Sequence, residues 1–104
     1  MKNFPSTYKY TLPKFWIDKV KFYNEFANGG MQVTIKIKNG IMYQQVLISN
    51  CMHIIAIKGY KDLPFTLDDI ADIFQTEEDK KLTKKEFNEQ GGWYYWDWDG
   101  RTNA

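Results

Sequence analysis

The chain has 104 residues, 43% hydrophobic and 17% aromatic, which predicts one folded domain over residues 1–104 and excludes a disordered chain. The net charge of +1 predicts no strong electrostatic partner, and the single cysteine, Cys51, excludes an internal disulfide framework and suits a reducing, cytoplasmic compartment. No apolar run has the length of a signal peptide or a membrane span, so no membrane partner is expected.

The first predicted element is a helix over residues 14–27. Thr11 is its candidate cap, and Pro13 is tolerated in a first turn. One helical stripe carries Trp16, Val20, Tyr23 and Ala27, and a second one carries Phe15, Phe22 and Phe26. Asn28-Gly29-Gly30 provides a stop. A strand through residues 20–22 is the competing interpretation.

The stretch from Met31 to Ser49 predicts a β-hairpin. Apolar and polar residues alternate over 31–38, the period of a strand with one face in water. Asn39-Gly40 predicts a two-residue turn in which both residues take positive φ. The resulting register places Met31 opposite Ile48, Val33 opposite Val46, Ile35 opposite Gln44, and Ile37 opposite Met42. Gln44 is the one polar residue on this face.

Three further elements are predicted after the hairpin. Residues 51–58 form a third strand, with apolar side chains on both faces. Thr66 caps a helix over residues 67–75, because apolar residues then follow at helical spacing. Residues 76–81 are expected to be a solvated, charged stretch, and Thr83 with Glu86 predicts a capping box for a short helix that ends near Gln90.

Residues 93–98, WYYWDW, form the densest aromatic run and predict a last strand. The expected fold is therefore α+β. It consists of a small bent antiparallel sheet or barrel, made of the meander over 31–58 and the strand over 93–98, packed with helices over 14–27 and 67–75. The meander resembles that of SH3-like and Sm-like small barrels. The aromatic end, the near-neutral charge and the small size also resemble bacterial immunity or toxin-antagonist proteins.

Candidate catalytic and metal-binding groups are few. Cys51 and His53 point the same way on a strand, but no third residue is placed to orient the imidazole. One histidine and one cysteine cannot complete a zinc site, and no phosphate-binding glycine motif occurs. Asp97 and Asp99 lie among aromatic rings, but a glycosidase needs a larger scaffold for a deep cleft. No enzymatic activity, metal or cofactor is therefore expected.

The aromatic run is the main functional signal. Six adjacent residues cannot all point inward, and exposed aromatic rings mark protein-binding sites. The leading hypothesis is a non-catalytic protein-binding module, such as an immunity protein, an inhibitor or an assembly subunit. Its predicted partner-binding residues are Trp93, Tyr94, Tyr95, Trp96, Asp97, Trp98 and Asp99. The opposing interpretation is that both faces of this strand are buried in the core.

Two alternatives use other partners. Lys36 and Lys38, with Tyr43 opposite Lys36, would form a surface for single-stranded nucleic acid through ring stacking and phosphate contacts. The low net charge and the acids of the aromatic run argue against that partner. The other alternative is a homo-oligomer in which the strand over 93–98 pairs with its own copy.

Overall fold

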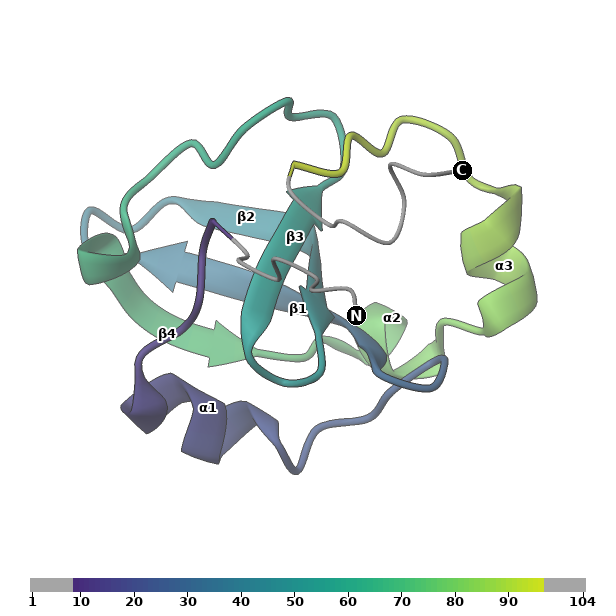
Figure 1. Cartoon of the computed structure of the whole chain (residues 1–104), viewed down its shortest axis with the longest axis horizontal. Coiled ribbons are helices and arrows are strands. Elements are labelled where there is room, and N and C mark those ends of the chain that lie inside the picture. The colour runs from purple at the N-terminus through teal and green to yellow at the C-terminus, as the bar shows by residue number, and fades with distance from the viewer. Residues whose placement is uncertain (1–8, 97–104) are drawn as a thin grey trace, which may run out of the picture.

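The computed structural model describes residues 9–96 and confirms the α+β class. An antiparallel sheet of four strands has the order β3-β2-β1-β4, and it is open, so the barrel alternative was wrong (Figure 1). The strands are β1 (Gly30–Ile37), β2 (Met42–Ser49), β3 (His53–Ile57) and β4 (Ile70–Phe74). The helices are α1 (Lys14–Val20), the 3-10 turn η1 (Leu67–Asp69), α2 (Glu77–Lys81) and α3 (Lys84–Glu89).

Both faces of the sheet carry buried apolar side chains. The first face bears the larger cluster, which includes Met31, Val33 and Ile35 of β1. The second face bears a smaller cluster of Leu47, Ile55 and Ala56, on which aromatic side chains from three other segments pack. Because alternate residues of a strand point to opposite faces, the two clusters make the sheet the middle layer of the fold.

The β1–β2 hairpin keeps only part of the expected register. Met31 lies opposite Ile48 and Val33 opposite Val46, as predicted, but Ile35 pairs with Tyr43 and not with Gln44. A β-bulge causes the shift, and Gln45 within it has a φ of 57°. The bulge moves Gln44 to an exposed position and packs Tyr43 against the first cluster, so the polar interruption disappears from that face.

The turn of this hairpin also differs from the prediction. Gly40 has a φ of 95°, but Asn39 is not among the residues with positive φ. The Ile37 N–H donates to the Ile41 carbonyl at 2.9 Å, so three residues form the loop. A type I turn followed by a left-handed glycine is the usual geometry for that length. The positive-φ pair occurs instead between β2 and β3, at Asn50 and Cys51.

We expect Gly40→Ala to lower the free energy of unfolding by about 1 kcal/mol, because a Cβ strains the left-handed conformation. An added Cβ meets no atom within 4 Å, so the backbone alone accounts for the loss. Gly91→Ala is the matched control, because its Cβ is also unobstructed and its φ is not positive. Urea denaturation of both variants tests this prediction, and equal losses would contradict it.

The helix predicted over residues 67–75 was wrong beyond its first turn. Thr66 and Asp69 do form a capping box, but only η1 follows, and residues 70–74 form β4 on the free edge of β1. A bulge at the Lys36/Ile37 step lets Ile70 and Ile73 share the buried face although they are three residues apart. The bulge therefore gives Ile70 and Ile73, two strand residues, the spacing of three that is typical of one face of a helix.

The other boundaries differ because of tertiary contacts. α1 ends at Val20 and not at residue 27, because the chain then turns along β4, where the Tyr23 hydroxyl donates to the Ile73 carbonyl at 2.8 Å. Thr11 does not cap α1; it pairs with His53 across an isolated bridge. β3 is shorter than the predicted 51–58, and a bulge within it, at Ile55, places the buried pair Ile54 and Ile57 three residues apart.

Residues 76–81 are not simply a solvated stretch. They contain α2, which Thr76 caps through its hydroxyl, and Asp79 of this helix is buried against β1. The predicted capping box at Thr83 and Glu86 is confirmed at the start of α3. The structure therefore bears out the capping pattern at α3 and contains an unpredicted capping box at α2, in addition to the one at Thr66.

Candidate protein-interaction surface

The outer edge of β3 is covered by two segments from opposite ends of the chain. The N-terminal segment is bonded through the Ile54 N–H, which donates to the Tyr10 carbonyl at 3.0 Å. The C-terminal segment is bonded twice. The Gly59 N–H donates to the Gly92 carbonyl at 2.8 Å, and the Trp96 N–H donates to the Ile55 carbonyl at 3.1 Å. We call residues 92–96 the aromatic segment. The two bonds, Gly59 with Gly92 and Ile55 with Trp96, make it antiparallel to residues 55–59.

The described part of the expected last strand is therefore not a strand. Residues 93–96 are extended but carry no strand assignment, and the fourth strand of the sheet is β4. One backbone bond joins Trp96 of the aromatic segment to Ile55 of β3, and a second joins Gly92 to Gly59, just beyond β3. Self-pairing of this segment stays a prediction. Asp97 and Trp98, the last two residues of the predicted strand, lie outside the described residues, and so does Asp99.

The aromatic segment contributes two rings to the second face of the sheet. Trp93 and Tyr95 are half-buried and pack on the second cluster. The Trp93 ring lies 5.2 Å from that of Phe87 on α3, and Phe87 lies 4.7 Å from Phe26, measured between ring centroids. Trp93 and Tyr95 thus pack on the core, as the interpretation of the aromatic run as buried supposed for them.

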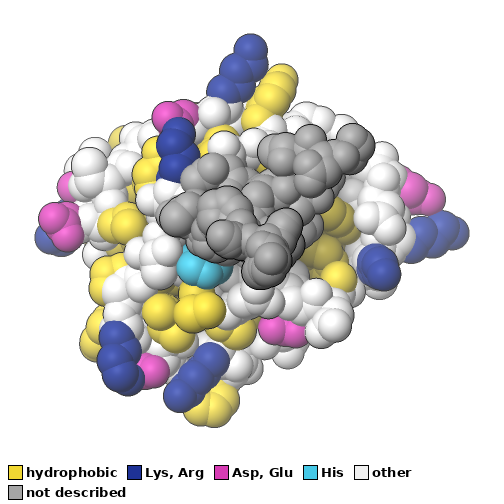
Figure 2. Space-filling view, in the orientation of Figure 1, with side chains coloured by type: hydrophobic (Ala, Val, Ile, Leu, Met, Phe, Trp, Pro, Cys, Tyr) yellow, Lys and Arg dark blue, Asp and Glu magenta, His cyan; other side chains and the backbone are white. Residues whose placement is uncertain are grey.

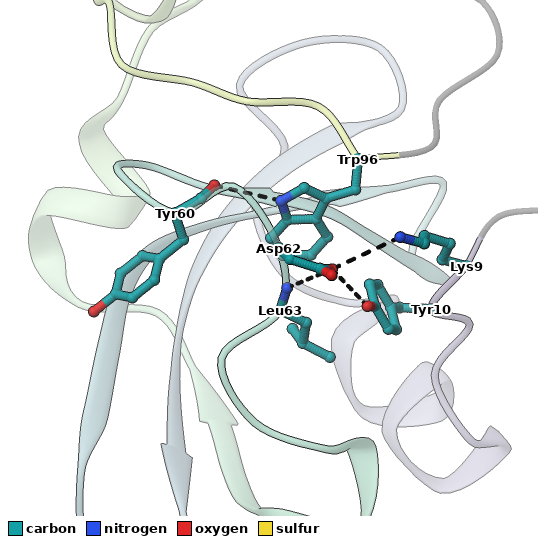
Figure 3. Close-up of polar contacts among 6 residues, drawn as sticks. All are labelled: Lys9, Tyr10, Tyr60, Asp62, Leu63 and Trp96. Carbon is teal, nitrogen blue, oxygen red and sulfur yellow. Dashed lines mark hydrogen bonds and ion pairs between the residues drawn. The ribbon is translucent and has the colours of Figure 1, made fainter.

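The other two rings are more accessible. Tyr94 is 43% exposed, and the Lys61 ammonium lies 5.5 Å from its ring centroid. Trp96 is half-buried beside the first cluster, where its ring meets Tyr10 edge to face at 5.4 Å. Its indole N–H donates to the Tyr60 carbonyl at 3.4 Å (Figure 3). The segment is therefore anchored by three rings and presents the fourth to solvent.

Asp62 joins the segment around Tyr10 to the loop that follows β3. Its carboxylate accepts hydrogen bonds from the Tyr10 hydroxyl at 2.6 Å and from the Leu63 N–H at 2.8 Å (Figure 3). The Tyr10 bond, followed by the Leu63 bond, lowers the pKa of Asp62 below its ordinary value. Lys9 lies 3.9 Å away at an exposed position, where ion pairs contribute little.

A cleft of about 270 Å³ opens beside the aromatic segment. Tyr95 forms part of its wall, together with Phe87 and Lys84 of α3. Its floor is apolar, with Leu47 and Ile55, and asparagine side chains contribute to its rim. An apolar floor with a few polar groups at the edge is the usual composition of a binding cleft. The sequence did not reveal this cleft, because its walls come from distant segments.

The exposed hydrophobic residues are not confined to this region. Phe15 on α1 is 70% exposed and Phe22, just beyond it, is 80% exposed. Where atoms of described residues are visible in Figure 2, hydrophobic and charged side chains are interspersed. Phe15 and Phe22 were predicted on one helical stripe, but α1 ends at Val20, so Phe22 lies outside the helix.

Cys51 and His53 have different partners. The Cys51 thiol lies 3.8 Å from a Glu25 carboxylate oxygen, whereas Nδ1 of His53 lies 3.0 Å from the Thr11 hydroxyl. Burial, and then the neighbouring Glu25 charge, raises the pKa of the Cys51 thiol. A raised pKa lowers the thiolate fraction, which is the reactive form. This geometry does not favour nucleophilic catalysis.

His53 predicts a pH dependence of stability. Burial lowers its pKa below the ordinary 6.5, so the unfolded chain binds the proton more readily than the folded chain. The free energy of unfolding should therefore be highest above pH 6.5 and fall as the pH decreases through the folded pKa. Urea denaturation on both sides of this pH measures the change. His53→Gln should remove it, because the chain has 1 His.

The predicted nucleic-acid surface does not assemble as expected. Lys36 pairs with Met42, and Tyr43 lies opposite Ile35. Lys36 and Lys38 are exposed, whereas Tyr43 packs on the first cluster with its ring 5.1 Å from that of Phe65. The bulge thus separates the lysines from the ring they were expected to accompany. Nucleic-acid binding stays a prediction, but the surface of Lys36, Lys38 and Tyr43 that was expected to carry it does not form.

Within residues 9–96, no group of three or more histidine, cysteine, aspartate or glutamate side chains could hold a metal ion. No helix in this part of the chain is long and apolar enough to cross a bilayer. Comparison with known proteins finds no matching family model, curated protein or solved structure.

Proposed function

We propose that this chain is a non-catalytic protein-binding module, of the kind found in immunity proteins, inhibitors and assembly subunits. The observation that carries the proposal is the exposed Tyr94 ring on a segment whose neighbour, Tyr95, lines the apolar cleft. Tyrosine and tryptophan are the preferred anchors of protein interfaces, where they fill apolar pockets on the partner. Tyr94 would enter a pocket on the partner, and a partner side chain would enter the cleft.

The local structure favours a firm contact surface. Trp96 is held by its indole bond to the Tyr60 carbonyl, and Trp93 by the second cluster, so little of the segment needs ordering on binding. Pre-ordered anchors avoid part of the entropy cost of association. The neighbouring Lys61, together with Lys84 at the cleft, suits a partner with acidic groups around an apolar centre.

Affinity capture from the source organism tests the proposal. Tagged wild-type protein should retain one specific partner, and Tyr94→Ala should reduce that retention at least tenfold without altering the circular dichroism spectrum. Phe22→Ser is the matched control, because it removes an exposed ring from the other surface. Loss of the partner with Phe22→Ser alone would move the interface to the surface around Phe22, and capture of no protein by the wild type would overturn the proposal.

A further inference from the structure

A second cavity, of about 180 Å³, lies between α2 and the strands β1 and β2. Its lining is almost entirely polar, in contrast to the cleft beside the aromatic segment. The lining residues are Gln32, Thr34, Gln44, Gln45, Thr76, Glu78, Asp79, Leu82 and Gln90. Glutamine side chains and carboxylates dominate this set, and both offer hydrogen-bond acceptors.

A buried carboxylate forms one wall of the cavity. Asp79 is 5% exposed and accepts hydrogen bonds from Gln32 Nε2 at 2.8 Å, the Thr34 hydroxyl at 3.0 Å and the Thr76 N–H at 2.9 Å. All three donors are neutral, and no described residue forms an ion pair with Asp79. Buried charges are usually paired, so a neighbouring positive group would lower the free energy of this site.

Gln32 supplies an independent observation. Its side chain is 5% exposed, and its Oε1 is buried without a hydrogen-bond partner in the part of the chain that the structure describes. Turning the amide over would not help, because Oε1 would then face the Asp79 carboxylate that Nε2 now bonds. A donor from outside the described residues would therefore satisfy this amide oxygen, and a buried acceptor without one destabilises the fold.

The size of the cavity limits which ligands it can hold. A volume of about 180 Å³ is several times the roughly 30 Å³ that one water occupies, and less than the roughly 300 Å³ at which small-molecule sites begin. A bare metal ion would leave most of this space empty. A planar guanidinium group carries five N–H donors and a positive charge, and it is weakly hydrated. It therefore matches a small, acceptor-rich cavity.

We propose that the cavity between α2, β1 and β2 binds a guanidinium group. The cation would compensate the Asp79 charge, and its N–H groups would reach the acceptors of Gln32, Gln44 and Gln45. Gln90 Oε1 is not counted among them, because it accepts from Lys58 Nζ at 3.2 Å. Glu78, at the exposed side of the cavity, would attract the cation toward the site. The guanidinium could belong to a free small molecule or to an arginine side chain of a peptide, and the site does not depend on the aromatic segment.

Titration with methylguanidinium chloride, followed by ¹H–¹⁵N spectra of the glutamine side-chain amides, tests the proposal. Methylurea is the matched neutral probe of the same shape. We expect saturable shifts of the Gln32 and Gln44 amides with methylguanidinium, and binding at least tenfold weaker with methylurea. Equal binding of the two probes, or no saturable shift with methylguanidinium, would overturn the proposal and leave a cavity that holds water only.

Two variants and two peptides complete the experiment. Asp79→Asn should weaken methylguanidinium binding at least tenfold, and if that variant does not fold, the two probes on the wild type still decide. Gln44→Leu removes an exposed acceptor and should weaken binding severalfold; an unchanged affinity would argue against the assigned cavity. A short arginine peptide that binds more tightly than methylguanidinium, and than its citrulline counterpart, identifies a protein side chain as the ligand, whereas a weaker one identifies a free molecule.

Discussion

Asp79→Ala should lower the free energy of unfolding by about 3 kcal/mol. Three donors on two elements lose their acceptor: Gln32 Nε2, the Thr34 hydroxyl and the Thr76 N–H. A buried donor left unsatisfied costs about 1–3 kcal/mol, and loss of a helix cap costs about 1 kcal/mol. For a domain of this size each kcal/mol corresponds to roughly 4–8 °C in the melting temperature. Thermal and urea denaturation measure the change.

Glu78→Ala is the matched control for this prediction. It removes an acid from the adjacent position of the same helix, where the side chain is exposed and takes no part in the capping box. Its expected effect is within about 0.5 kcal/mol, as for most surface substitutions. Similar losses from the two variants would show that the effect comes from the charge of the α2 segment and not from the buried hydrogen bonds.

Trp93→Ala should have the second-largest effect, a loss of about 2–3 kcal/mol. The ring packs on Leu47, Ile55 and Ala56 of the second cluster and against Phe87. Replacing a buried tryptophan by alanine typically costs 3–5 kcal/mol, and Trp93 is only half-buried, so a smaller loss is expected. Urea denaturation followed by circular dichroism gives the free energy.

Two neighbouring substitutions check the interpretation of Trp93. Tyr94→Ala, at the next residue, should leave stability within about 0.5 kcal/mol, because that ring is 43% exposed. Trp93→Phe should restore most of the loss, because it keeps a ring on the cluster and removes an indole N–H that is buried without a partner among the described residues. If Tyr94→Ala proves the more destabilising change, the assignment of core and surface within the aromatic segment is reversed.

The separation of core and surface within WYYWDW could not be deduced from strand alternation. Strand alternation would have placed Trp93 and Tyr95 on one face and Tyr94 and Trp96 on the other. Trp93 and Tyr95 do share the second face, but Trp96 packs near the first cluster while Tyr94 points to solvent. The reason is that residues 93–96 lie along the edge of β3 without forming a strand, so no continuous ladder imposes a period of two.

Bulges explain most of the other differences. Leu67, Ile70, Ala71 and Phe74 at helical spacing, with Ile73 beside them, predicted a helix. Gln44 on the apolar face of the hairpin looked like an interruption. Both observations follow from residues inserted into strands, one at the Lys36/Ile37 step and one at Gln45. A bulge depends on pairing with a neighbouring strand, and for β4 that neighbour, β1, is distant in the sequence. Local periodicity alone therefore predicts the wrong element at β4.

Local chemistry by itself determined the β1–β2–β3 meander, the buried apolar side chains of β1, the N-cap at Thr66 and the capping box at Thr83. These features depend on the alternation of residues and on side chains within three positions of one another. The alternation also placed Gln32 and Thr34 on a face in water, which was wrong, because both are buried. Tertiary structure alone decided that residues 70–74 complete the sheet, that Asp79 is buried and that Tyr94 is the exposed ring. Each of these outcomes depends on burial against, or pairing with, segments remote in the chain, which no sequence window contains.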